Sequence, residues 1–355
     1  MRAWRWLTLL AACLALPAAL GAEPGARARG KSLPGAHQFG VIVHPFREGN
    51  NDAMLKQALL DSGPASLAFL VATGIKAASE PCSDKLYAQR KQLLDQAPGP
   101  VIVSLAASDW IQCKSALGRS AAIERLNRLR ETFFDEPRSL GERKIALARL
   151  SASAKFRSYA ENAHWQYGRI LYATINLPAD NNHYLPEAGR NSEFEDRQVA
   201  NRAWLKRLFL MAQRKNMEGI VLFSDADLGL GEERDDAYVA PGLGTQKDGF
   251  AETRRQISTL APKFHGKLLL IDAQGTPKPN ITWHGKLGHL TLNAGALTVR
   301  VNPGSSALFT LKPAPKSALK PAHKFALEPA AEPAPEPALK PGASAQAAAR
   351  GTRLR

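Results

Sequence analysis

The sequence contains few cysteines and lacks the short motifs that mark several large enzyme classes. Three cysteines in 355 residues are too few for a disulfide-dense scaffold or a four-cysteine zinc site. There is no glycine-rich phosphate-binding loop of the Walker or dinucleotide type, and no serine in the glycine-flanked setting of a nucleophile elbow. No internal apolar run is long enough to span a bilayer. These absences argue against P-loop and dinucleotide-dependent enzymes, serine hydrolases and polytopic membrane proteins.

Acidic residues are scarce relative to basic ones. Lys and Arg number 47 against 32 Asp and Glu, which gives a formal net charge of +15. The 45% of apolar residues and 22% of charged residues exclude a chain that is disordered throughout. A basic balance can indicate nucleic-acid binding, but aromatic residues make up only 7% and do not interleave with the basic runs. We therefore expect no nucleic-acid partner, and favour anionic polymers of the cell envelope if there is a polymeric partner.

Residues 1–22 have the pattern of a secretory signal peptide. Two arginines precede an apolar stretch over residues 6–20, which Pro17 interrupts. The stretch is too short to span a bilayer comfortably, so we expect no transmembrane span after signal removal. The pattern predicts an exported protein, periplasmic or secreted, with residues 23–37 as a flexible segment. A lipobox-like order before Cys13 makes a lipoprotein the second interpretation.

The composition changes at residue 312 and stays biased to the end of the chain. Pro, Ala and Lys dominate residues 312–355, and Ala-Leu-Lys/Glu-Pro occurs three times. Frequent proline blocks helix and sheet hydrogen bonding, so we predict a disordered tail. The tail carries eight basic and three acidic side chains. It is either an arm that touches anionic envelope polymers or a solvated tail with no partner.

Residues 38–311 alternate between β-rich apolar runs and helical patterns, which predicts an α/β domain. Continuous apolar runs indicate strands that are buried on both faces, at 39–43, 67–71, 101–105, 170–175, 220–223 and 268–271. Helices are expected at 53–60, 86–94, 121–133 and 195–215. A later β segment, 276–311, contains short strands at 281–283, 290–292, 297–301 and 308–311. The order predicts a layered α/β sandwich.

Several polar side chains follow the ends of predicted strands, namely His44, Asp109, Asp225, Asp227 and Asp272. Ligand sites of open α/β sheets collect at the carboxyl ends of strands. One imidazole and several carboxylates could therefore hold a metal. The alternative is that these are ordinary loop carboxylates, which cap helices or turns.

A second polar group, Asn181-Asn182-His183, lies in a turn-rich segment after a strand. These side chains are candidates for contact with an anionic ligand, although Asn-Asn is also common turn chemistry. The later histidines have no ligand spacing between them and are not predicted to form a site: His265, His284 and His289.

A series of short segments occurs in a distinctive order between Phe39 and Leu311. The segments are Ile75-Lys76, Ser79–Asp84, Asp109–Cys113, Arg125–Phe134, Glu161–Trp165, Leu171–Asn176, Asn181-Asn182 and Asn201–Leu205. Together they resemble the metallophosphoesterase (calcineurin-like phosphatase) superfamily, and within it an exported bacterial branch. The resemblance implies a layered α/β/β/α sandwich with a central hairpin at 161–176. It also implies a phosphoric ester hydrolase where the family's metal site is intact.

The positions that match the family's metal ligands carry no such ligands in this chain. The family holds two divalent metals about 3.5–4 Å apart on Asp, Asn and His side chains at strand ends. The matching positions here are Val43, Gly74, Ser108, Ile271 and Gly275. Valine, glycine and isoleucine cannot bind a hard cation, and serine is a weak ligand. The resemblance therefore implies a degenerate member whose dinuclear site has been dismantled.

Two functions remain open on this basis. The first is a non-catalytic binding or scaffold protein of the cell envelope, for which we expect no cofactor and no catalytic residue. The second is a metal-dependent phosphoesterase with a rewired site that binds Mn, Fe or Zn. The candidate residues of that rewired site are His44, Asp109, Asp225 and Asp272.

Two cysteines, Cys82 and Cys113, remain after signal removal. Each lies just beyond a predicted strand, and the two strands would be neighbours in the fold that the resemblance implies. An even pair in an oxidising compartment indicates a disulfide, and two buried free thiols are the alternative. We predict that the two cysteines are joined.

Overall fold

The computed structural model describes residues 35–46, 53–61, 67–186, 191–230, 237–239, 245–275, 279–293 and 295–312. The chain divides after Lys312 into two units, Met1–Lys312 and Pro313–Arg355. All of the described residues belong to the first unit, so the predicted signal peptide, Cys13 and the tail after Lys312 lie outside them. The first strand begins at His37, within the segment that was expected to be flexible.

The first unit has a mixed α/β fold, which confirms the general class that the sequence predicts. Its described residues form a five-stranded sheet in the order β14-β13-β1-β2-β3 and a seven-stranded sheet in the order β11-β12-β10-β7-β6-β5-β4. The first sheet comprises β1 (His37–Val43), β2 (Leu70–Thr73), β3 (Val101–Ser104), β13 (Gly295–Val301) and β14 (Phe309–Leu311). The second comprises β4 (Ala148–Arg149), β5 (Ala163–Tyr167), β6 (Ile170–Thr174), β7 (Gly219–Phe223), β10 (Lys267–Asp272), β11 (Ile281–His284) and β12 (Leu287–Thr291). A separate hairpin pairs β8 (Ala237–Val239) with β9 (Thr245–Lys247).

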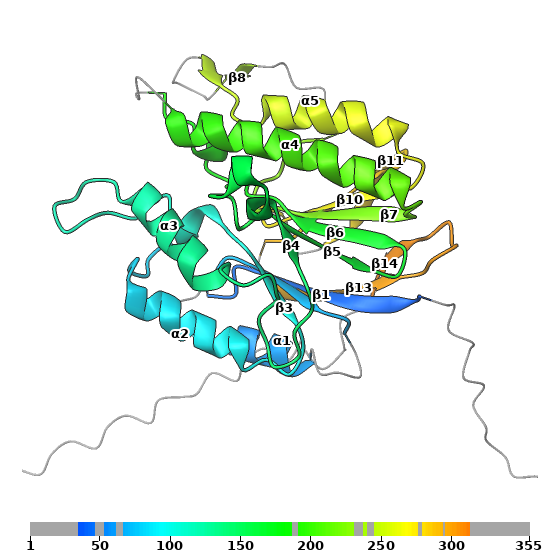
Figure 1. Ribbon diagram of the computed structural model, residues 1–355, viewed down its shortest axis with the longest axis horizontal. Coiled ribbons are helices and arrows are strands. Elements are labelled where there is room, and N and C mark those ends of the chain that lie inside the picture. The colour runs from blue at the N-terminus through cyan, green and yellow to red at the C-terminus, as the bar shows by residue number, and fades with distance from the viewer. Residues whose placement is uncertain are drawn as a thin grey trace, which may run out of the picture. The chain divides into compact units, whose positions relative to one another are not determined.

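Helices cover the outer faces of the two sheets (Figure 1). They are α1 (Ala53–Asp61), α2 (Asp84–Asp95), α3 (Ala122–Phe133), α4 (Ser192–Arg214) and α5 (Ala251–Leu260). Short 3-10 turns are η1 (Ala107–Asp109), η2 (Leu150–Ala152), η3 (Ala154–Phe156), η4 (Asn181–His183) and η5 (Ala261–Lys263). Among the described residues, no helix has both the length and the apolar character needed to cross a membrane.

The strand pattern produces three apolar layers, because successive side chains of a strand point to opposite faces. Phe39, Val41 and Val43 of β1 pack between the two sheets, together with Tyr172 of β6. Ile42 of the same strand packs on the other face, in the cluster formed with α1, α2 and α3. A third cluster joins the outer face of the seven-stranded sheet to α4 and α5. Each sheet therefore buries apolar side chains on both of its faces. This burial stabilises the fold by roughly 25 cal/mol for each Å² of apolar surface removed from water.

The parallel strands fix where a ligand can approach. β1, β2 and β3 are parallel to one another, and so are β6, β7, β10 and β12. In each sheet the carboxyl ends of these strands therefore lie along one edge. The hairpin predicted by the resemblance is confirmed, since β5 and β6 pair antiparallel across Gly168, whose φ of 55° suits glycine.

The predicted disulfide between Cys82 and Cys113 is confirmed, with the two Cα atoms 5.7 Å apart. It joins the segment before α2 to the segment after η1. Beside it, the Tyr87 hydroxyl donates to the backbone oxygen of Asp109 at 2.9 Å. The cross-link therefore fixes two of the segments that follow the strands of the first sheet.

Candidate functional site

The carboxyl ends of parallel strands from both sheets meet around one depression of about 260 Å³. Seven strands contribute a residue to its wall, each from the segment that follows the strand: His44, Lys76, Ser108, Ala179, Asp225, Gln274 and Asn293. This is the position at which open α/β sheets bind ligands. The depression is therefore the candidate functional site.

Asp225 is the one carboxylate among the described residues that line the depression. Its side chain is buried, and Oδ2 accepts hydrogen bonds from the backbone N–H groups of Ala107 at 2.7 Å and Ala179 at 2.8 Å. Gln274 donates its Nε2 to Oδ1 at 3.3 Å. Burial raises the pKa of Asp225, and the two backbone N–H donors oppose that rise. Asp225 therefore connects the segment after β3, in one sheet, with the segments after β6 and β10, in the other.

Asp109 is a second buried carboxylate, and its oxygens are occupied by the backbone. Oδ1 accepts from the N–H groups of Ile75 at 2.8 Å and Lys76 at 3.3 Å, and Oδ2 accepts from that of Ala106 at 2.8 Å. Complete burial raises its pKa to about 7 against these hydrogen bonds. Asp109 joins the segments after β2 and β3, so it fits the loop-carboxylate alternative better than the role of a metal ligand.

Two basic groups lie at the depression. His44 has a left-handed φ of 43°, and its Nε2 lies 3.7 Å from Oδ1 of Asp225. The Lys76 ammonium donates to the backbone oxygen of Ala77 at 2.7 Å. Burial lowers the pKa of Lys76, and the nearby charges of Asp109 and Glu80 oppose this. The depression thus combines one buried carboxylate with an imidazole and an amine.

The five positions that match the family's metal ligands lie on the strand ends, but not all of them face the depression. Val43 and Ile271 point into the apolar layer between the sheets. Ser108 lines the depression, and Gly74 lies beside His44 with a φ of 85°. At Gly275 an added Cβ would lie 2.4 Å from the backbone carbon of Thr291, so a histidine does not fit there without movement of the chain.

These residues do not fit a dinuclear metal centre. Such a centre needs several side-chain ligands with free lone pairs between the two sheets. Asp109 and Asp225 instead use their oxygens to accept backbone N–H groups, and Val43 and Ile271 are apolar core residues. We therefore derive no catalytic step through a metal pair at this edge.

The rewired set proposed from the sequence is not assembled as one site. Asp272 and Ile271 are consecutive in β10, so their side chains point to opposite faces of the sheet. Asp272 lies on the outer face, where its Oδ2 is 2.5 Å from Nε2 of His289. His44 and Asp225 remain together, whereas Asp109 and Asp272 each have a different environment.

The candidate ligand group Asn181-Asn182-His183 is engaged within the protein rather than in the depression. All three residues have positive φ angles, 40°, 55° and 53°, in the turn η4. Asn182 accepts from the buried guanidinium of Arg197, and His183 Nδ1 lies 3.1 Å from Glu193 Oε2. Asn tolerates the left-handed region better than most residues. The turn interpretation therefore describes this segment, and none of its three side chains lines the depression.

Two polar groups at these strand ends are not among the site residues predicted from the sequence. Gln274 reaches the depression because it follows β10, and a glutamine after a strand carries no distinctive signal. His289 reaches Asp272 only through the parallel pairing of β10 with β12. Comparison with models of known protein families and with curated proteins gives no match. What the chain does is therefore inferred from the geometry at these strand ends.

Proposed function

We propose that the chain is an exported, metallophosphoesterase-like protein of the layered α/β/β/α type, whose dinuclear site has been dismantled. In this proposal it binds a small polar ligand in the depression without turning it over, as a binding or scaffold protein of the cell envelope. The proposal is supported by the hydrogen bonding of Asp225. Its Oδ2 accepts backbone N–H groups from segments of both sheets, so this oxygen connects loops instead of coordinating a metal.

The chemistry of the lining supports a binding role. A metal-activated water requires several side chains that coordinate the cation, and the described lining offers one carboxylate, Asp225, and one imidazole, His44. The remaining polar lining includes Lys76, Ser108 and Gln274, which supply hydrogen-bond donors. A volume of about 260 Å³ is near the lower end of small-molecule sites, so the ligand is small.

Turnover assays test the catalytic half of this proposal. The purified chain is incubated with a generic phosphomonoester and a generic phosphodiester in the presence of Mn²⁺, Fe²⁺ or Zn²⁺. We expect no turnover above that of the buffer. Turnover that disappears in both His44→Gln and Asp225→Asn, but persists in His289→Gln, would establish a phosphoesterase with a rewired site in the depression and overturn the proposal.

A binding screen tests the other half. Ligand-observed NMR with a library of small polar fragments is run on the wild-type chain and on Ser108→Tyr, in which the larger side chain fills the depression. The matched control is Ser158→Tyr, at an exposed position outside the lining. We expect some fragments to show binding signals with the wild type and with Ser158→Tyr, and to lose those signals with Ser108→Tyr. Fragments that bind Ser108→Tyr as well as they bind the wild type would place binding elsewhere.

A further inference from the structure

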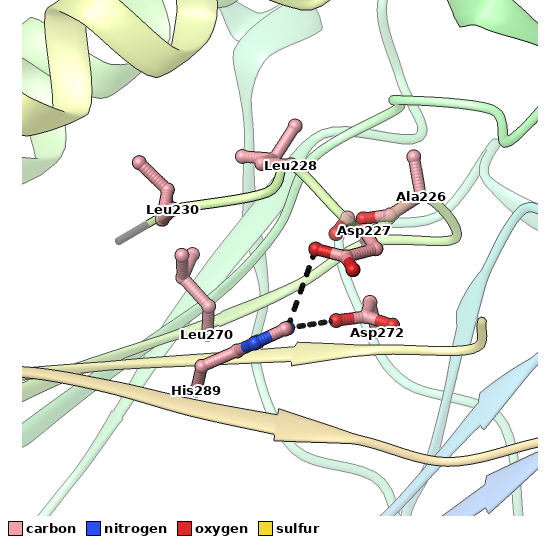
Figure 2. A pocket seen from close by; sticks show the side chains of 8 residues that line it. Ala226, Asp227, Leu228, Leu230, Leu270, Asp272 and His289 are labelled. Carbon is pink, nitrogen blue, oxygen red and sulfur yellow. Dashed lines mark hydrogen bonds and ion pairs between the residues drawn. The ribbon is translucent and has the colours of Figure 1, made fainter. Parts of the chain in front are cut away.

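A second cluster of polar side chains lies on the other face of the seven-stranded sheet. Ile271 and Leu290 pack between the two sheets, so their neighbours Asp272 and His289 point outward. Asp227, in the segment after β7, completes the group (Figure 2). This cluster therefore lies across the sheet from the inter-sheet positions that match the family's ligands, and it is independent of the proposed function.

The three side chains converge on one point. His289 Nε2 lies 2.5 Å from Asp272 Oδ2 and 3.6 Å from Asp227 Oδ1. One ligand atom from each residue lies within 4.8 Å of the other two. Figure 2 shows the ring of His289 directed at both carboxylates, with Leu228, Leu230 and Leu270 around them. The arrangement presents one nitrogen and two oxygen ligands from three different segments.

Each carboxylate is held in place by a second interaction. Asp272 Oδ1 accepts from the Thr291 hydroxyl at 2.6 Å and from the backbone N–H of Gln274 at 3.0 Å. Asp227 Oδ1 accepts from the backbone N–H of Gly229 at 2.7 Å. Outer partners of this kind orient ligating carboxylates at metal sites. These interactions fix the direction of both carboxylates and leave Asp272 Oδ2 directed at His289.

An independent observation is a small cavity against the same three side chains. Its volume is about 10 Å³, and Asp227, Asp272 and His289 lie in its wall with apolar side chains. A cavity of roughly 10–15 Å³ accommodates one water-sized particle. The space beside the ligand atoms thus suits one ion or one water molecule rather than an organic ligand.

We propose that Asp227, Asp272 and His289 bind one transition-metal cation, with Zn²⁺ as the best fit. Three protein ligands of mixed nitrogen and oxygen type, with water in the remaining position, are typical of zinc. Imidazole disfavours Mg²⁺ and Ca²⁺, which prefer oxygen ligands. The cation takes the place of the hydrogen between His289 Nε2 and Asp272 Oδ2, and it binds the neutral imidazole, whose ring proton then lies on Nδ1. Ligands around zinc lie roughly 3.3 Å apart, so the pair opens by about 1 Å through side-chain rotation.

The competing interpretation is a hydrogen-bonded Asp272–His289 pair that only stabilises the sheet. Asp227→Asn separates the two interpretations, because it removes a ligand charge and leaves that pair in place. His289→Gln removes the nitrogen ligand. The matched control is His284→Gln, on the adjacent strand β11 and outside the cluster. His44→Gln tests whether the cation binds instead in the depression.

The experiment is isothermal titration calorimetry of Zn²⁺, and of Mg²⁺ as a comparison, into the full chain without a polyhistidine tag. We expect one Zn²⁺ per chain, no measurable Mg²⁺ binding, and unchanged affinity in His284→Gln and His44→Gln. Asp227→Asn and His289→Gln should each weaken Zn²⁺ binding about 100-fold, since even outer partners are worth about 10–100-fold. Circular dichroism establishes that each variant is folded. Absence of stoichiometric binding to the wild type, equal binding by folded Asp227→Asn, or loss of binding in His44→Gln would each overturn the proposal.

Discussion

Substitution of Asp225 separates a carboxylate that connects loops from one that coordinates a metal. In the structure its Oδ2 accepts both backbone N–H groups, while Oδ1 faces Gln274 and His44. Asp225→Asn can place its amide oxygen at the Oδ2 position and keep both backbone bonds. Asp225→Ala removes the acceptor altogether. If Asp225 coordinates a metal, both variants lose that coordination. If Asp225 connects the loops, only Asp225→Ala loses the two backbone hydrogen bonds.

The size of the effect follows from the two hydrogen bonds. An unpaired buried N–H group costs about 1–3 kcal/mol. Both bonds of Asp225 are only part-buried, so water can reach the freed groups and the lower half of that range applies. Asp225→Ala should therefore lower the free energy of unfolding by about 2–4 kcal/mol, and Asp225→Asn by less than about 1 kcal/mol. For a domain of this size 1 kcal/mol corresponds to about 2–4 °C in melting temperature.

Urea unfolding at pH 7, followed by circular dichroism, measures both variants against the wild type. Asp180→Ala is the matched control, because Asp180 is an exposed residue of a neighbouring segment. It should change the free energy of unfolding by less than about 0.5 kcal/mol. An Asp225→Ala variant as stable as the wild type, or an Asp225→Asn variant as destabilised as Asp225→Ala, would refute the connecting role of Asp225.

Three further predictions concern the disulfide, a buried carboxylate and the tail. Replacement of Cys82 and Cys113 by serine, which opens a loop of sequence separation 31, should cost about 3–4 kcal/mol in thermal unfolding; free thiols at both positions in non-reduced native protein, measured by mass spectrometry, would contradict it. The pKa of Asp109 is raised from 3.8 to about 7, so its contribution to stability is complete below pH 3.8 and is lost as the pH rises through 7. Urea unfolding between pH 4 and pH 8 should therefore show the wild type losing stability relative to Asp109→Asn, and a difference that is constant with pH would refute this. Truncation before Pro313, at the boundary of the first compact unit, should leave the melting temperature nearly unchanged; a cooperative loss of stability would show that the tail packs on the domain.

Much of the fold could be predicted from local patterns. Continuous apolar runs identified β1, β6, β7 and β10, because these strands are buried on both faces. α5 was not predicted, since only Thr253 and Ile257 of its ten residues are buried and its sequence carries a narrow apolar stripe. The strands with continuous apolar sequences could therefore be predicted, whereas helix α5, which has few buried residues, could not.

The candidate site was predicted less well, because it depends on which face a side chain occupies and on strand pairing. The alternation of side chains along β10 places Asp272 and Ile271 on opposite faces of the sheet, which separates Asp272 from the rest of the predicted rewired set. The encounter of Asp272 with His289 depends on the register of β10 against β12, which pairs Leu270 with His289. No spacing in the sequence encodes that register, so the cluster with Asp227 emerges only in three dimensions.

The pairing of β1 with β13 has a consequence for how the chain acquires its fold during synthesis. His37 pairs with Val301 and Val43 with Gly295, so one side of the first strand is completed by a segment from near the end of the domain. At about 5–20 residues per second, the roughly 250 residues between them take about 10–50 s to be made. Throughout that interval an apolar strand has an unsatisfied edge, which is the kind of segment that holdase chaperones bind and that aggregates when left exposed. The edge of β1 therefore stays unpaired until β13 has been synthesised.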